Sequence, residues 1–222
     1  MPISKEIFKK PAVIIIFTLI LILFSSWPAY LLVNWDIISI DGLWFPFVIA
    51  LSALISMFVL PALVIRHFFK ENLSDYGLLL VNGGQIIKYI LVPLILSLPL
   101  IFFLASKPSF EQYYFVKDRF HGLYILSILW SAVYYFSEEF IFRGFLFFGL
   151  WNRLKIHSFW ITNLIFAIFH LGKPHGEMFI AFFSGIYLSY ITYKTKSFVP
   201  AAIIHFIFAL VLNIVITFVY LT

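Results

Sequence analysis

The stretch Trp130–Ser–Ala–Val–Tyr–Tyr–Phe–Ser–Glu–Glu–Phe–Ile–Phe–Arg–Gly–Phe–Leu–Phe–Phe148 sets two adjacent carboxylates, Glu138 and Glu139, in otherwise apolar sequence. The other acidic residues of the chain all fall in polar segments. A carboxylate at the centre of a membrane-spanning helix costs about 2.5–3.5 kcal/mol even on insertion scales. Two of them side by side, with Arg143 one turn later, make an intramembrane functional site the first hypothesis.

The composition predicts an integral membrane protein. Of the 222 residues, 63% are hydrophobic and 11% are charged, and the mean hydropathy is +1.04. Soluble domains carry about 25% charged residues. We expect an all-α, polytopic helical bundle that forms one domain, residues 1–222, because no polar stretch is long enough to fold separately. The absence of cysteine excludes disulfides, thiolate metal sites and a cysteine nucleophile. The net charge of +5 lies in short loops and favours contact with anionic membrane lipids over nucleic acid.

Charge-free stretches predict the membrane-spanning helices, since about 20 apolar residues cross the hydrocarbon core. These stretches are 11–35, 42–65, 89–106, 122–137, 158–169, 178–193 and 197–222. Seven spans with a cytoplasmic N-terminus place the basic connections inside and the mixed loop 107–121 outside. The first stretch lacks an Ala-x-Ala cleavage site and is expected to be retained. The segment Leu123–Trp151 is long for one crossing, so it is either a tilted helix or it breaks near Ser137, which would give eight spans.

Two readings compete for the charged residues of the central stretch. On a helix Glu139 and Arg143 share a face at ion-pair spacing, so they could simply lock the bundle. Glu138 lies about 100° away and would then need its own partner. Two further ionisable groups lie in apolar sequence, His170 and His205. A lone histidine there is usually a hydrogen-bonded bundle residue, but two of them with an unexplained glutamate favour a site.

Glu138, His170 and His205 suggest two kinds of chemistry. They could hold a water molecule, with Glu138 as general base and the imidazoles as orienting or oxyanion-stabilising groups. They could instead bind zinc through three ligands with an open position. No HExxH pair is present, and the spacing of the three residues does not distinguish the water-holding site from the zinc site. We favour a site without a cofactor and keep zinc as the alternative.

The remaining polar residues are given structural interpretations. No Gly-x-Ser-x-Gly motif is present, so the intramembrane serines are expected to pack helices. His175 and Glu177 are expected in a short solvated loop. Histidines at the ends of spans are expected at the membrane interface. The serines are Ser131, Ser137 and Ser184; the interfacial histidines are His67, His121 and His157.

The order of motifs resembles the family of CAAX proteases and bacteriocin-processing enzymes, called CPBP or Abi. The matching residues are Glu138–Glu139–x–x–x–Arg143, Phe166–x–x–x–His170, Phe182–x–x–Gly185 and a histidine in the last span. The resemblance covers residues 120–215, whereas residues 1–119 match only as family-variable membrane helices. It implies an all-helical intramembrane fold and a glutamate-dependent endopeptidase, which cleaves after prenylated cysteines or in leader and membrane peptides.

The resemblance also implies roles for individual residues. Glu138 would activate water, and Glu139 and Arg143 would support it. His170 would be the second water-holding residue, with Phe166 as part of its motif, and His205 would lie on the oxyanion side. Family members often carry His-x-x-x-Asn in the last motif. Here the fourth position is Ala209, and Asn213 lies about 12 Å from His205 along a straight helix.

Three functions follow from these residues. The first is an intramembrane endopeptidase in a bacterial plasma membrane, acting on a peptide, lipopeptide or lipoprotein. The second is a non-proteolytic relative that acts in bacteriocin self-immunity, as a membrane scaffold with a membrane protein partner, or in lipid or lipoprotein modification. A small transporter would also explain buried charge, but it predicts symmetry between the halves, and none is visible.

Overall fold

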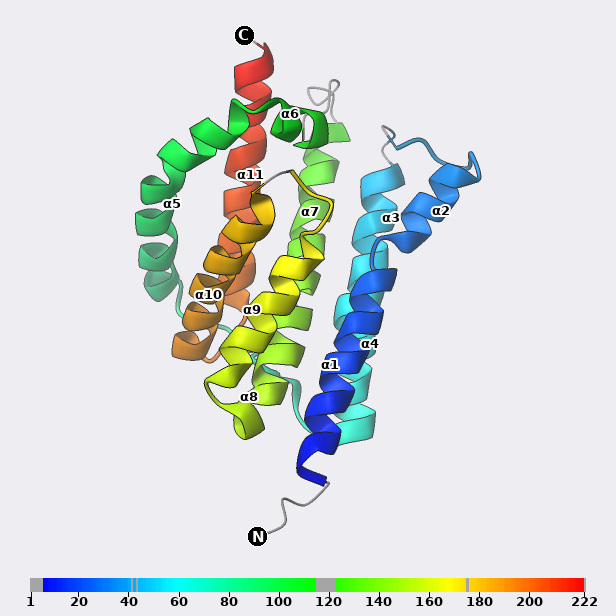
Figure 1. The fold of residues 1–222 in the computed structure, drawn as a ribbon, viewed down its shortest axis with the longest axis vertical. Helices are drawn as coiled ribbons and strands as arrows, with labels where there is room; N and C mark the ends of the chain where they lie inside the picture. The colour runs from blue at the N-terminus through cyan, green and yellow to red at the C-terminus, as the bar shows by residue number, and fades with distance from the viewer. Residues whose placement is uncertain (1–5, 41, 43, 115–122, 175, 222) are drawn as a thin grey trace.

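The computed structural model describes residues 6–40, 42, 44–114, 123–174 and 176–221, and these residues form helices and no strand (Figure 1). The N-terminal helices are α1 Glu6–Phe24, α2 Trp27–Asn34, α3 Trp44–Ala53, η1 Leu54–Val59, α4 Leu60–Leu63, η2 Val64–Phe69 and η3 Leu73–Tyr76. The remaining helices are α5 Gly83–Ala105, α6 Pro108–Tyr114, α7 Leu123–Glu139, η4 Phe140–Phe148, α8 Gly149–Leu154, α9 His157–Phe169, α10 Glu177–Thr195 and α11 Val199–Leu221. The segments η1, η2 and η4 are π-helical, and η3 is a 3₁₀ turn.

The predicted all-α membrane bundle is confirmed, and the described residues of each charge-free stretch are mostly helical. Four helical segments among the described residues are long and apolar enough to cross a membrane: Lys10–Asn34, Trp44–Phe69, Ile86–Ala105 and Val199–Thr217. The shorter α9 is apolar as well. The remaining long helices carry the charged residues of the site or basic residues at their ends. The total of seven spans and the cytoplasmic N-terminus stay predictions.

The first apolar stretch is two helices rather than one. The chain bends at Ser25 and Ser26, where the Ser25 hydroxyl donates to the Ile22 carbonyl oxygen at 2.8 Å. Pro28 then lies in the first turn of α2, where its missing N–H costs nothing. In Figure 1 α2 leaves the axis of α1 at a clear angle. The apolar run alone gave no sign of this bend.

The helices α7, η4 and α8 follow one another without a break and together form a central rod. The chain therefore does not turn back near Ser137. The α-helix α7 runs directly into η4, with Glu139 in the helical region at φ −69°, and then into α8. Residues 140–147 are all buried. A helical segment that is buried around its whole circumference lies inside a bundle. The rod packs against α3 on one side and α11 on the other, while α9 covers η4. The two glutamates therefore lie where the central α-helix widens into a π-helix, a feature frequent at functional sites.

One polar cluster ties α1 to the segment that follows η2. The Lys10 ammonium lies 2.6 Å from both carboxylate oxygens of Glu71, and the Tyr76 hydroxyl donates to the same carboxylate at 2.6 Å. Burial alone would raise the pKa of Glu71, but the bonds from Lys10 and Tyr76 outweigh it and hold this pKa below its usual value. The ionised Glu71 therefore stabilises the folded chain.

Glu71→Gln is expected to lower the free energy of unfolding by about 1 kcal/mol, since the pair is part-exposed and solvent-screened. Because the folded pKa is depressed, this stabilisation is present above the unfolded pKa, near 4.5, and is lost as pH falls through the folded value. Unfolding curves in detergent at several pH values test this. Wild type should lose its advantage over Glu71→Gln in acid. A constant difference down to strongly acidic pH would contradict the assignment.

Candidate active site

Glu139 is the centre of a buried ion cluster. Its Oε1 atom accepts from Nη1 of Arg143 at 3.1 Å and from Nδ1 of His205 at 2.7 Å. Glu139 and Arg143 have no exposed surface, and the His205 side chain is 17% exposed. The predicted ion pair between Glu139 and Arg143 is present. The contact to His205, on the distant helix α11, was not predicted, since it joins residues 66 positions apart.

Arg143 is held on its other sides by helices α9 and α10. Its guanidinium carbon lies 4.0 Å from the ring centroid of Phe166, and Nη2 donates to the Gly185 carbonyl oxygen at 3.3 Å. A cation over an aromatic face gains about 2 kcal/mol when both are desolvated. Phe166 and Gly185, both part of the motifs found in the sequence, therefore form the binding site of the Arg143 guanidinium, which we call the arginine seat.

Gly185→Ala is expected to disturb this seat. A Cβ at residue 185 would lie 2.6 Å from Oδ1 of Asn163 and 3.0 Å from Nη2 of Arg143. Overpacking of this kind costs about 1–3 kcal/mol, measured as the free energy of unfolding in detergent. The matched control is Gly83→Ala, where a Cβ meets no atom within 4 Å. Equal stability of the two variants would show that the seat adapts freely.

Glu138 differs from its neighbour in having no hydrogen bond. It is 1% exposed, and neither carboxylate oxygen meets a donor in full bonding geometry among the described residues, although the Tyr134 hydroxyl, one turn earlier, lies within interaction range. Glu138 also lies within electrostatic range of His205 and Lys173. A buried carboxylate without partners is costly, and an unexplained one is a functional candidate.

His170 caps the end of α9 and is 4% exposed. Its Nδ1 atom lies 2.8 Å from the carbonyl oxygen of Phe166, and the two rings meet at 4.6 Å. A carbonyl can only accept, so Nδ1 carries the proton. In the neutral imidazole Nε2 is then an acceptor. His205 has the same tautomer when neutral, because Nδ1 faces the Glu139 carboxylate.

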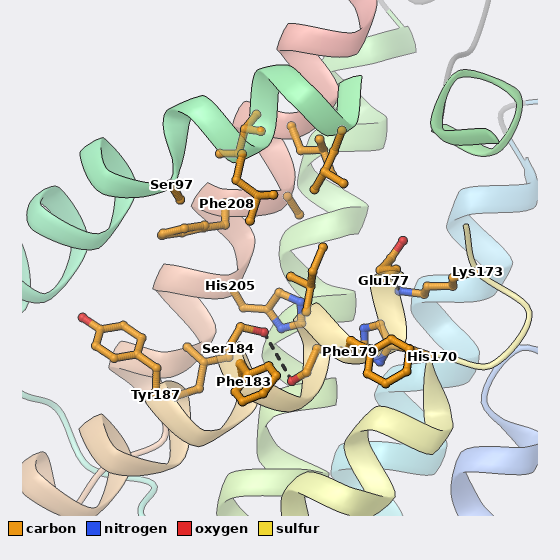
Figure 2. A pocket seen from close by; sticks show the side chains of 18 of the residues that line it. Ser97, His170, Lys173, Glu177, Phe179, Phe183, Ser184, Tyr187, His205 and Phe208 are labelled. Atoms are coloured by element: carbon orange, nitrogen blue, oxygen red, sulfur yellow. Dashed lines mark hydrogen bonds and ion pairs between the residues drawn. The ribbon is translucent and has the colours of Figure 1, made fainter. Parts of the chain in front are cut away.

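His170 and His205 line one cavity of about 480 Å³, a size typical of ligand sites. Figure 2 shows the His205 imidazole near the middle of the lining side chains and His170 on the side of Lys173 and Glu177. Its walls come from helices α5, α6, α7, α9, α10 and α11, and they are mostly aliphatic and aromatic. Tyr135, one turn before Glu138 and Glu139, belongs to this wall, whereas the two glutamates do not line it. The cavity is therefore a largely apolar space that is lined by the two imidazoles but not by the carboxylates of Glu138 and Glu139.

The prediction of a solvated loop at Glu177 is wrong. Glu177 begins α10 and lines the cavity; its carboxylate accepts from the Tyr114 hydroxyl at 2.7 and 2.8 Å and pairs with Lys173 at 3.2 Å. The polar sequence around Glu177 resembled a loop, because its partner Tyr114 lies 63 residues earlier. His175 and His121 lie outside the described residues, as does part of the loop 107–121.

The remaining sequence predictions concern serine, zinc and the last motif. Ser137 and Ser131 donate to carbonyls one turn earlier, as helix-packing serines do. Among the described residues, no three His, Asp or Glu side chains are grouped closely enough to hold a metal ion. Ala209 lines the cavity, and the Asn213 amide donates to the Ala209 carbonyl oxygen at 3.3 Å.

Comparison with known proteins agrees with the motif order. Residues 120–211 match the family described as type II CAAX prenyl endopeptidase Rce1-like. No curated protein and no solved structure matches the chain. The matched segment carries Glu138, Glu139, Arg143, His170 and His205, and it lies within residues 120–215, which carry the motifs. The match therefore supports the assignment of residues 120–211 to the CAAX protease family.

Proposed function

We propose that the protein is an intramembrane endopeptidase that hydrolyses a peptide bond with water activated by Glu138. The observation that carries this proposal is the buried, unbonded carboxylate of Glu138 behind two cavity-lining imidazoles. Glu139, by contrast, accepts hydrogen bonds from both Arg143 and His205 through its Oε1 atom. One glutamate of the pair therefore has a structural role, and the other is free for chemistry.

In this mechanism Glu138 and Nε2 of His170 accept the two hydrogens of one water. Glu138 takes a proton as the water oxygen attacks the carbonyl carbon of the scissile bond, which gives a tetrahedral oxyanion. The protonated Glu138 then delivers the proton to the departing nitrogen, and the C–N bond breaks. The products are a carboxylic acid and an amine. His205, when protonated at both nitrogens, faces the oxyanion with Nε2.

The cavity supports a membrane-associated substrate, such as a peptide, lipopeptide or lipoprotein. Helices α5 and α11 contribute Leu100, Ile101, Leu104, Phe208 and Leu212 to its wall. Such a wall accepts apolar side chains or a lipid chain but gives no partner to a polar one. The polar groups gather at His170, Lys173 and Glu177 (Figure 2).

Purified wild type and Glu138→Gln, each reconstituted in lipid and incubated with membrane-peptide and lipopeptide pools, test the proposal. Mass spectrometry should find new peptide termini with wild type that are missing with Glu138→Gln. Termini produced equally by both proteins would contradict the role of Glu138. No cleavage by wild type would contradict the peptidase.

Ala209 favours a second candidate, because it gives no side-chain donor near His205. Losing one oxyanion donor costs about 10²–10³ in rate. A non-proteolytic relative, acting as a scaffold or in self-immunity, would tolerate that loss. Its signature is a Glu138→Gln variant that still complements a chromosomal deletion. A lipid-modifying enzyme would instead lose function in that variant and give lipid products rather than peptides.

A further inference from the structure

The two imidazoles that line the cavity are poor oxyanion donors in their neutral form. Nδ1 of His170 donates to a carbonyl, and Nδ1 of His205 donates to Glu139. Each Nε2 is then an acceptor, which suits a water proton but repels an oxyanion. Peptide hydrolysis needs a donor about 2.7–3.1 Å from the developing negative oxygen. Some other group must therefore supply it whenever His205 is neutral.

Most hydroxyls in the cavity wall are already committed. Ser97 donates to the Leu94 carbonyl oxygen at 2.9 Å, and Ser184 donates to that of Ala181 at 3.3 Å (Figure 2). These bonds lie within their own helices. Both serines therefore satisfy local backbone carbonyls rather than the cavity.

The committed tyrosines are Tyr114 and Tyr187. Tyr114 donates to Glu177, and Tyr187 donates to the Tyr89 carbonyl oxygen at 2.7 Å. Among the described wall residues, this leaves Tyr135 as the one hydroxyl with no hydrogen bond. Lys173 is the remaining donor, and its charge is paired with Glu177.

Tyr135 is also well placed. It lies on α7, one turn before Glu138 and Glu139, and its ring centroid is 4.5 Å from that of His205. It is within electrostatic range of Glu138. The ring thus holds His205 from one side, while Phe166 meets the same imidazole at 5.9 Å. A phenol is neutral and is a donor in either protonation state of His205.

The geometry points to Tyr135 as a further catalytic residue, whose hydroxyl donates to the oxyanion formed during peptide hydrolysis. This inference rests on the proposed function. It gives the site a donor that does not depend on position 209. The covalent steps remain those given above, and Tyr135 neither gains nor loses a proton overall.

Tyr135→Phe tests the inference, since it removes the hydroxyl and keeps the ring on His205. On a substrate that wild type cleaves, kcat should fall about 10²–10³-fold, while KM changes little. Tyr187→Phe is the matched control, a cavity tyrosine whose hydroxyl is committed elsewhere. A phosphinic peptide analogue of the same substrate should lose affinity for Tyr135→Phe by a similar factor. Melting curves establish that both variants are folded.

A rescue variant separates catalysis from structure. Ala209 lies one turn after His205 and lines the cavity, so Asn at this position can present an amide donor. Ala209→Asn in the Tyr135→Phe background should recover at least tenfold in kcat. Wild-type kcat in Tyr135→Phe, or an effect confined to KM, would overturn the inference. A larger loss in Lys173→Met would also overturn it by assigning the donor to Lys173.

The failure of this inference can be told from failure of the peptidase. An inactive Glu138→Gln beside a fully active Tyr135→Phe refutes the role of Tyr135 alone. Absence of any wild-type cleavage refutes both.

Discussion

Glu138→Gln is expected to lower kcat by about 10²–10⁴-fold, the usual contribution of a general base. The amide has the shape of the carboxylate but cannot take a proton from water. The same change should leave the protein at least as stable as wild type. Glu138 is buried without a hydrogen bond, and removing an unpaired buried charge relieves a desolvation cost. Activity and stability are therefore expected to move in opposite directions.

Single-turnover rates and unfolding curves in detergent, measured on the same preparations, check both halves of this prediction. Glu139→Gln is the matched control. It removes the neighbouring charge, which accepts from Arg143 and His205, so it should lose stability as well as activity. A Glu138→Gln variant that unfolds more readily than Glu139→Gln would mean that the structural and chemical roles are exchanged.

Arg143→Met should be the most destabilising of the substitutions considered. It leaves Glu139 buried with only His205 as a partner, and it removes the cation from the face of Phe166. Removing one partner of a buried ion pair costs about 3–5 kcal/mol. This cost is measured as the free energy of unfolding in detergent or as the loss of folded protein on expression.

Arg153→Met is the control, because Arg153 is an exposed residue at the end of α8, and it should change stability by less than about 0.5 kcal/mol. In the double variant Glu139→Gln/Arg143→Met, the total loss should be smaller than the sum of the single losses. Strict additivity would show that the two side chains do not form one energetic unit.

The sequence predicted the helices well, because long apolar runs have few alternatives in a membrane. The absence of charge over residues 11–35 predicted one helix and hid the bend at Ser25–Ser26, although two serines shortly before Pro28 are typical of the start of a new helix. The sequence also left open whether the chain reverses near Ser137. In the structure η4 is buried on every side and the chain does not reverse. This burial comes from helices that are distant in the sequence.

For the site, local spacing identified the Glu139–Arg143 pair correctly, since i and i+4 residues meet on one helix. Local spacing could not predict partners that are distant in the sequence. Nothing near His205 indicates Glu139, and nothing near Glu177 indicates Tyr114. Tyr135 was passed over because an aromatic residue in an apolar helix is usually a packing residue. Its significance emerges only when the hydrogen bonds of the other cavity hydroxyls are assigned.

The π-helical segment η4 restricts how this chain can vary in length. A π-helix holds more residues per turn than an α-helix. Deleting one of residues 140–148 has one of two results: η4 reverts to an α-helix that absorbs the deletion, or η4 stays π-helical and the residues downstream rotate relative to the glutamates. A deletion between Glu139 and Arg143 would change their spacing from four residues to three, and with it the direction from which Arg143 approaches the carboxylate. Apolar residues in η4 can be exchanged for others of similar volume, whereas a change in their number alters either the helix type or the register of the residues that follow. In this part of the protein, the shape of the helix depends on the count of residues as well as on their identity.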